Sequence, residues 1–386
     1  MIRARNSSRF SWMLAITGPI GTPRSTSTAW LGAPGPSAGS MRSGRTSTFS
    51  GAPAVLDEQL GGEEMHAETT GLVDLVVENG RVVGAVLETN GASRTVRTRR
   101  GVLLATGGFE HNDELRTRFG VPGESRDTMG PWGNQGLAHL AGIAAGADTD
   151  LMDQAWWSPG LTHPDGRSAF ALWFTGGIFV NAEGRRFTNE SAAYDRLGRA
   201  VLDAMADGSV TLPYWMVYDN AEGLVPPVKA TNVSMVEPER YVEAGLWQTA
   251  DTLEELATLI GVPPQNLVDT VDRFNGFVGR GVDEDFGRGD EAYDRAFSGG
   301  APPLYPIVEA PFHAAAFGVS DLGTKGGLRT DSAARVLDTA GNPIPGLYAA
   351  GNTMAAPSGH AYPGGGNPIG TSMVFSHLAV KNMLES

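Results

Sequence analysis

The pattern of apolar and polar positions from Leu72 onward predicts an α/β chain. Residues 72–88 (LVDLVVENGRVVGAVLE) read as two strands around an Asn-Gly turn, the usual signal of a β-hairpin. Residues 101–108 (GVLLATGG) are apolar throughout and end in glycine. That pattern is typical of a buried parallel strand whose carboxyl end approaches a ligand. Residues 133–150 predict a helix after a glycine-rich turn.

The pattern changes in the middle of the chain, where Trp and Tyr are frequent and short strands alternate with helices. Residues 176–190 (GGIFVNAEGRRFTNE) predict a hairpin. Residues 251–281 predict two helices separated by two prolines, with Asp251 or Thr252 as the first N-cap. Residues 283–295 (DEDFGRGDEAYDR) are interpreted as an acidic, solvated loop.

The α/β style returns at His313, so the predicted domains are nested. We expect one domain from residues 63–150 and 313–386, interrupted by a second domain at residues 151–312. Residues 1–62 differ from both, because no Asp or Glu precedes Asp57 and no periodic pattern persists. A targeting peptide, a disordered tail and a mistranslated stretch are all compatible with this composition, and we favour disorder or mistranslation.

Composition limits the function classes. The chain has 386 residues, a net charge of −14 and 41% hydrophobic residues, as expected for a globular protein of about two domains. The acidic balance argues against nucleic acid as a partner. Without cysteine there is no disulfide, thiolate metal site or cysteine nucleophile, and no metal site is predicted. No apolar run approaches the roughly 20 residues of a membrane span, so we expect a cytoplasmic protein.

Two glycine-rich segments near the C-terminus are candidates for chemistry. Residues 346–352 (GLYAAGN) form an apolar strand ending at Gly351, with polar Asn352 just beyond. Small residues there admit a cofactor, although a plain buried strand and turn is an equal alternative. Residues 358–370 (SGHAYPGGGNPIG) precede a helix that we expect to begin near Gly370. Its free N–H groups suit an anionic or carbonyl oxygen, and the alternative is a connecting loop.

Five segments together resemble one enzyme family from about Glu64 to the C-terminus. They are VLLATGGFEHN, GGIFVNAEGRRFTNESAAYD, TKGGLRTD, GLYAAGN and AYPGGGNPIGTSMVFSHLA. In this order they resemble the fumarate reductase/3-ketosteroid dehydrogenase flavoproteins. The resemblance implies FAD as cofactor and a Rossmann-type FAD-binding domain interrupted by an α+β catalytic domain. It also implies the following FAD contacts: Gly107, Gly108, Gly351, Asn352, Ile369 and Gly370.

The departures from the fumarate reductase pattern favour the 3-ketosteroid Δ1-dehydrogenase branch. Tyr194 stands where fumarate reductases have an arginine acid, DLGTKGG lacks their histidine, and residues 358–370 contain no arginine. A dicarboxylate would therefore be short of cations. The Δ1-dehydrogenase branch carries a tyrosine in the first segment and a YPGxG loop, as here. It implies a cyclic ketone or steroid substrate; the electron acceptor stays open.

The resemblance gives three residues catalytic roles. The Tyr362 hydroxyl and the Gly366 N–H would polarise a ketone. Tyr194 would take the α-proton, provided that its surroundings lower its pKa from about 10. FAD would accept the hydride. Four aromatic residues are candidates for an apolar substrate slot or, equally, for the core: Trp156, Trp157, Trp173 and Phe174.

Two alternatives stay open. The first is a fumarate reductase-like enzyme for a small unsaturated acid. The second is an inactive truncated homologue, because residues 1–130 contain no G-x-G-x-x-G, the segment that holds the FAD pyrophosphate in such proteins. The missing phosphate-binding loop predicts that this chain binds FAD poorly and folds marginally.

Overall fold

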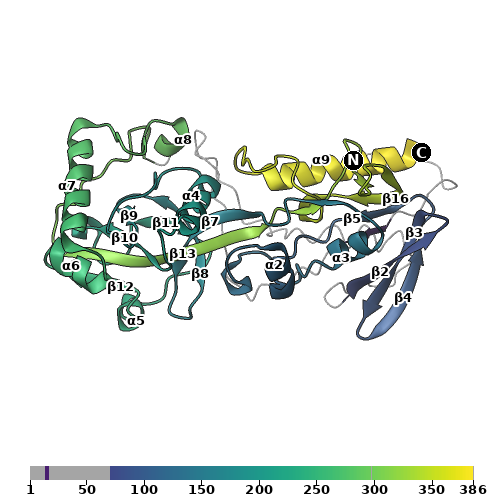
Figure 1. Cartoon of the computed structure of the whole chain (residues 1–386), viewed down its shortest axis with the longest axis horizontal. Coiled ribbons are helices and arrows are strands. Elements are labelled where there is room, and N and C mark those ends of the chain that lie inside the picture. The colour runs from purple at the N-terminus through teal and green to yellow at the C-terminus, as the bar shows by residue number, and fades with distance from the viewer. Residues whose placement is uncertain (1–13, 17–69, 297, 386) are drawn as a thin grey trace, which may run out of the picture.

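The computed structural model describes Leu14–Ile16, residues 70–296 and residues 298–385. The chain forms two lobes joined by a long strand, β13 (Phe312–Thr324), which crosses one lobe and ends at the junction with the other (Figure 1). The α/β composition of alternating strands and helices agrees with the sequence prediction.

The first lobe is built on a four-stranded sheet in the order β1-β5-β16-β15. β1, β5 and β16 are parallel, and β15 is antiparallel to β16. Val102 and Leu104 of β5 face one hydrophobic cluster and Leu103 faces another, because successive side chains of a strand point to opposite faces. The predicted buried parallel strand is thus confirmed. The four strands are Leu14–Ile16, Val102–Leu104, Pro343–Ala349 and Arg335–Leu337.

Helix α9 (Asn367–Glu385) packs on one face of this sheet through Ala379 and Met383. The other face packs against α3 (Leu137–Ala144) and an antiparallel meander. The meander contains the predicted hairpin, whose Asn79 and Gly80 both have positive φ (49° and 74°), as a tight two-residue turn requires. Its strands are β2 (Thr70–Glu78), β3 (Arg81–Thr89) and β4 (Ala92–Arg97), and α2 (Asp113–Phe119) follows β5.

The second lobe is a seven-stranded sheet in the order β11-β8-β7-β13-β10-β9, with β12 also on β13. Both faces are covered, so β13 is buried along nearly its whole length. The strands are Val228–Thr231, Ser168–Phe174, Ala155–Thr162, Phe312–Thr324, Tyr214–Tyr218, Ile178–Val180 and, for β12, Trp247–Ala250.

Helices cover this second sheet. The two predicted helices between residues 251 and 281 are confirmed as α6 (Leu253–Ile260) and α7 (Pro264–Arg280), with Thr252 as the N-cap of α6. The remaining helices are α4 (Tyr194–Ala206), α5 (Pro238–Glu243) and α8 (Ala292–Arg295). A short two-stranded ladder of β6 (Thr149–Asp150) and β14 (Gly327–Leu328) lies where the chain passes between the lobes.

Two details differ from the sequence prediction, and a third prediction is mostly untested. The predicted boundary between residues 312 and 313 falls at the start of β13, and the second sheet runs on to Thr324. Helix α9 begins at Asn367, earlier than expected, which places Pro368 in the first turn where its missing N–H costs no helical hydrogen bond. Within residues 1–62 only Leu14–Ile16 is described, as a short strand, and the prediction for the rest lies outside the described residues.

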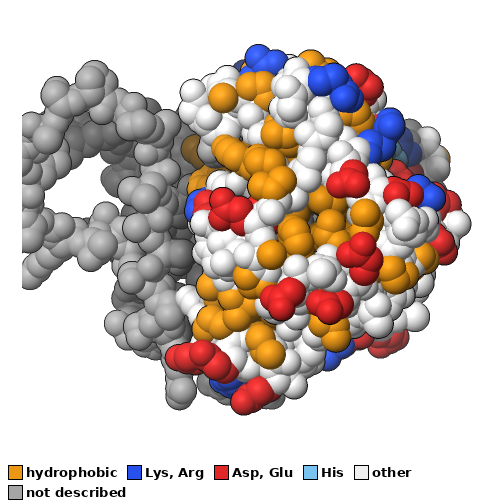
Figure 2. Space-filling view, turned by 90° about the vertical axis from the view of Figure 1, so that its left-hand side faces the viewer, with side chains coloured by type: hydrophobic (Ala, Val, Ile, Leu, Met, Phe, Trp, Pro, Cys, Tyr) orange, Lys and Arg blue, Asp and Glu red, His pale blue; other side chains and the backbone are white. Residues whose placement is uncertain are grey.

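The outer end of the second lobe carries acidic side chains scattered among apolar ones (Figure 2). This face offers no continuous basic surface of the kind that binds nucleic acid. In the part of the chain that the structure describes, no helix combines the length and the apolar character needed to cross a bilayer.

Candidate active site

Tyr194 and Tyr362, which the sequence assigned to one site, meet at the junction of the two lobes. Their hydroxyl oxygens are 2.5 Å apart, within hydrogen-bonding distance. Their ring centroids lie 4.8 Å apart. Tyr194 is the first residue of α4, and Tyr362 lies in the loop that precedes α9. The fold therefore brings together two residues separated by 168 positions.

Tyr194 is held by the close packing of α4 on β7. A Cβ added to Gly198 would lie 2.7 Å from the Ser158 nitrogen and from the Trp157 Cβ, so only glycine permits this approach. On the same helix, Leu197 and Val201 are fully buried in the core of the second lobe. The start of α4, and with it Tyr194, is consequently fixed against the sheet.

A buried ionic network supports the segment just before α4. Glu190 accepts hydrogen bonds from Arg186 (2.7 and 2.9 Å), Arg288 (3.1 Å) and the Phe179 backbone N–H (3.0 Å). Arg186 also binds Asp283 at 2.8 Å. These four side chains are at most 4% exposed. Asp294, which is also buried, accepts from Asn189 at 3.0 Å.

This network corrects the interpretation of residues 283–295 as a solvated loop. Asp283, Arg288 and Asp294 are buried, and they join this loop to the Arg186–Glu190 segment. The alternation of acidic residues and glycines gave no sign of burial. The partners lie about a hundred positions away in sequence, so no local pattern could reveal them.

Burial raises the pKa of Tyr194 well above its usual value, and the hydrogen bond to Tyr362 raises it further. Burial likewise raises the pKa of Tyr362. The condition set for Tyr194 as a base, a pKa lowered by its surroundings, is therefore not met, because a phenolate loses hydration here without gaining a cation. Both tyrosines are neutral near pH 7.

The loop after Tyr362 is open on the side where a flat ligand would lie. A Cβ added to Gly364, Gly365, Gly366 or Gly370 would meet nothing within 4 Å, and Ile369 is 70% exposed. The Gly366 carbonyl accepts from the Gly370 N–H (2.8 Å), which makes Gly366 the residue that opens α9. Among the described residues, none accepts a hydrogen bond from the Gly366 N–H.

The predicted FAD contacts beyond the ends of β16 and β5 have different surroundings. Gly351 and Asn352 lie just beyond the end of β16, after Ala350, and the Asn352 side chain accepts from the Trp156 indole N–H at 3.2 Å. Gly107 and Gly108 follow β5, and neighbouring protein atoms leave no room for a side chain at either position. A Cβ at Gly107 would lie 2.3 Å from the Asn134 side chain, and one at Gly108 2.2 Å from the Thr324 hydroxyl. Their proposed contact with FAD stays a prediction.

The open glycine loop and the start of α9 fit the ring end of FAD, since both present backbone donors and no obstructing side chain. These residues, with Asn352 beside them at the end of β16, are the ones that would hold that end of the cofactor.

The four candidate aromatic residues do not form one slot. Trp157 and Phe174 belong to the core of the second lobe. Trp156 packs edge-on against Tyr362, with ring centroids 5.8 Å apart. Phe170, which the sequence did not single out, packs the same way against Tyr194 at 5.3 Å. The apolar surroundings of the tyrosine pair thus come from β7 and β8.

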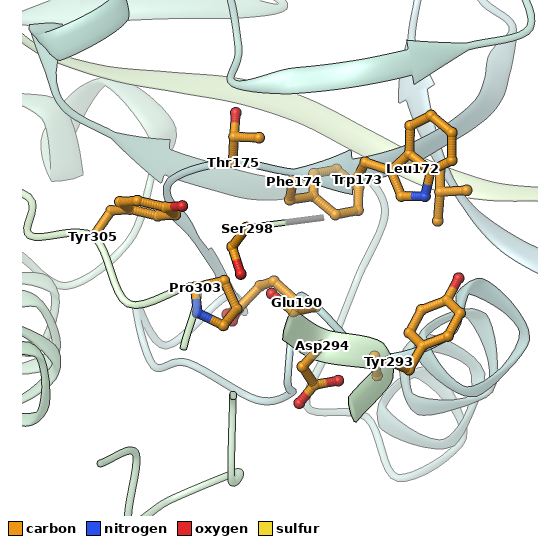
Figure 3. Close-up of a pocket in the computed structure, with 12 residues that line it drawn as sticks. Leu172, Trp173, Phe174, Thr175, Glu190, Tyr293, Asp294, Ser298, Pro303 and Tyr305 are labelled. Atoms are coloured by element: carbon orange, nitrogen blue, oxygen red, sulfur yellow. The ribbon is translucent and has the colours of Figure 1, made fainter. Parts of the chain in front are cut away.

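A narrow cavity lies between the end of β8 and the α8 segment (Figure 3). Trp173 and Phe174 line one side of it, and Glu190, Tyr293 and Asp294 line the other. Its volume of about 20 Å³ admits a water molecule and no fused-ring molecule. Figure 3 therefore shows a space beside the site and not the substrate slot.

Lys325 is the site residue that sequence reasoning missed. It follows the end of β13 and is fully buried. Its ammonium donates to the Ala361 carbonyl, next to Tyr362, at 2.8 Å, and lies 4.3 Å from the centre of the Trp156 ring. The only signal in the sequence was a lysine between a buried strand and two glycines, which by itself points to no role.

The family follows from a comparison with known proteins. The FAD binding domain family matches residues 21–369, which is most of the chain. The chain belongs to this FAD-binding family. FAD is accordingly its cofactor, as the resemblance implied. The matched residues include both strand ends described above and the open loop as far as Ile369.

Individual proteins resemble the chain more specifically. It is 39% identical to a 3-oxosteroid 1-dehydrogenase of Mycolicibacterium smegmatis over 80% of its length, and 34% identical to a 4-oxocyclohexanecarboxylate 2-dehydrogenase of Sinomonas cyclohexanicum over 78%. The match spans 57% and 54% of those two proteins.

A solved structure also matches the chain. The 3-ketosteroid Δ1-dehydrogenase from Sterolibacterium denitrificans, in complex with 1,4-androstadiene-3,17-dione, superposes with a TM-score of 0.74 at 33% identity. The match covers 82% of this chain and 59% of that one. The arrangement of the two lobes is therefore shared with a ketosteroid dehydrogenase.

Proposed function

We propose that this chain carries the ketone-activating half of an FAD-dependent dehydrogenase that acts on a C–C bond beside a ketone, in a cyclic ketone or 3-ketosteroid. The observation that carries the proposal is the hydrogen-bonded pair of Tyr194 and Tyr362 beside the open glycine loop. We further propose that the parallel strands β1, β5 and β16 belong to a Rossmann-type domain that the second lobe interrupts.

The residues of this chain divide the work on the substrate. The Tyr362 hydroxyl and the Gly366 N–H, which no described residue accepts from, bind the ketone oxygen and stabilise negative charge on it as the α-proton leaves. Tyr194 takes that proton at its hydroxyl oxygen while its own proton passes along the hydrogen bond to Tyr362, which in turn gives its proton to the ketone oxygen. Bound FAD supplies the hydride acceptor. Because burial raises the pKa of Tyr194, proton removal depends on strong polarisation of the ketone.

The surroundings favour a ketone over a dicarboxylate. Two cations on the segments that carry the tyrosine pair or contact them are already engaged. Lys325 binds the Ala361 carbonyl and Arg199 binds Asp195 at 3.0 Å. A dicarboxylate would need several cations to balance its charge, whereas a neutral ketone needs only hydrogen-bond donors. Two aromatic residues packed on the pair, Trp156 and Phe170, suit an apolar ring.

Steady-state turnover with an artificial electron acceptor tests the proposal. We expect the chain carrying FAD to oxidise a 3-ketosteroid and not to act on fumarate or succinate. Replacing Tyr362 by phenylalanine removes one of two donors to the ketone and should lower kcat by roughly 10²–10³. Equal turnover of Tyr362→Phe and wild type, or a preference for the dicarboxylate, would overturn it. The flavin content of the purified chain tests separately whether FAD is bound weakly, as the sequence predicts.

A further inference from the structure

The end of β13 is clamped between two other segments, and Lys325 lies in that clamp. Its backbone N–H donates to the Gln154 carbonyl (2.8 Å), and its carbonyl accepts from the Ala356 N–H (3.1 Å). A Cβ at Gly326 would lie 2.2 Å from the Leu151 carbonyl oxygen. The two glycines that follow Lys325 therefore permit a backbone approach that leaves the lysine main chain little freedom.

The Lys325 side chain extends from this clamp to the loop that contains Tyr362. Its ammonium donates to the Ala361 carbonyl and lies over the face of Trp156. Trp156 in turn packs against Tyr362 and donates its indole N–H to Asn352. One buried cation is thus in direct contact with the segment preceding Tyr362 and with the ring that packs on Tyr362.

We propose that Lys325 is a positioning residue for Tyr362, and that its protonated side chain orders the loop that presents the tyrosine to the ketone. A charge-assisted hydrogen bond to a backbone carbonyl is stronger than a neutral one. A cation over an aromatic face adds to it when both are shielded from water. The positioning of the loop by Lys325 follows from these contacts alone, while its effect on turnover rests on the proposed function.

The strength of this anchor depends on protonation. Burial lowers the pKa of Lys325 to about 8, from an ordinary value near 10.5. Asp195 opposes that shift and Arg199 adds to it, both from α4. The two neutral tyrosines lie on the neighbouring segments, and His139 of α3, whose pKa burial lowers to about 4, is hydrogen-bonded to the Gly326 backbone and is neutral in this range. The ammonium is therefore retained below about pH 8 and lost above it, within a range where wild-type protein can be studied.

Amide hydrogen exchange of the full-length chain measures the anchor without any need for turnover. We expect Lys325→Met to reduce the protection of amides between residues 356 and 366 by about tenfold or more. Lys325→Arg keeps a cation and donors and should restore most of that protection. The amides of α7, far from the clamp, serve as an internal control for global unfolding.

A second measurement needs no variant. In wild-type protein, protection of the same loop should fall as the pH rises through about 8, after correction for intrinsic exchange, while α7 stays unchanged. In Lys325→Arg this transition should disappear. Unchanged loop protection across that pH range in wild type, or in a folded Lys325→Met, would overturn the proposal. If the loop responds as expected but ketone turnover is absent, the proposed function fails and the positioning role of Lys325 survives.

Discussion

Replacing Glu190 by alanine removes the centre of the network that supports the start of α4. The carboxylate accepts four hydrogen bonds and balances two arginines together with Asp283, so the variant leaves one uncompensated positive charge in a buried site. Four charged hydrogen bonds at about 1.5–3 kcal/mol each would total more than about 6 kcal/mol. Arg186 keeps Asp283 and water can enter the vacated space, so we expect a loss of about 3–5 kcal/mol.

Urea unfolding followed by tryptophan fluorescence measures this loss. Glu291→Ala is the matched control, because Glu291 pairs with Arg196 at 2.8 Å while both side chains are more than half exposed (56% and 60%). An exposed pair is worth about 0.2–1 kcal/mol. A loss below about 1 kcal/mol for Glu190→Ala, equal to that of the control, would refute the reasoning that the network is buried and cooperative.

Further predictions concern single contacts. Thr252→Ala should lower the free energy of unfolding by about 1 kcal/mol, because the Thr252 hydroxyl accepts from the Glu255 N–H at the start of α6 (3.2 Å). Thr252→Ser should restore that stability, and equal stability of the Ala and Ser variants would contradict the capping role. Phe317→Ala should cost about 3–5 kcal/mol in the same unfolding assay, since the ring is fully buried among three aromatic rings. In ultraviolet titration, Tyr194→Phe should lose no tyrosinate absorbance near pH 10, because burial raises the pKa of Tyr194; loss of one residue's signal there contradicts the burial.

Local signals in the sequence were sufficient for individual elements. The Asn79–Gly80 turn, the apolar β5 strand and the Thr252 cap each depend on residues close together in the chain, and the structure has them as predicted. The extent of β13 was not predictable in this way. Its pairing partners β7, β10 and β12 lie far away in sequence, and they decide where the second sheet ends.

The candidate site was likewise predictable only in part from the sequence. Tyr194 and Tyr362 were paired through motifs that resemble a known family, and the structure brings their hydroxyls together. The raised pKa of Tyr194 and the burial of Lys325 follow from tertiary packing, in which segments from both lobes exclude water. A residue's type fixes its ordinary pKa, but only its neighbours fix the direction of the shift.

Anaerobic mixing of the full-length chain carrying FAD with 4-androstene-3,17-dione tests the central claim most directly, because it follows one hydrogen transfer without an electron acceptor. The account predicts that the flavin absorbance bleaches in wild type, and that Tyr194→Phe with the same FAD content bleaches roughly 10²–10⁴ times more slowly. A wild-type flavin that stays oxidised in the presence of the ketone, or a Tyr194→Phe variant that bleaches at the wild-type rate, would contradict it.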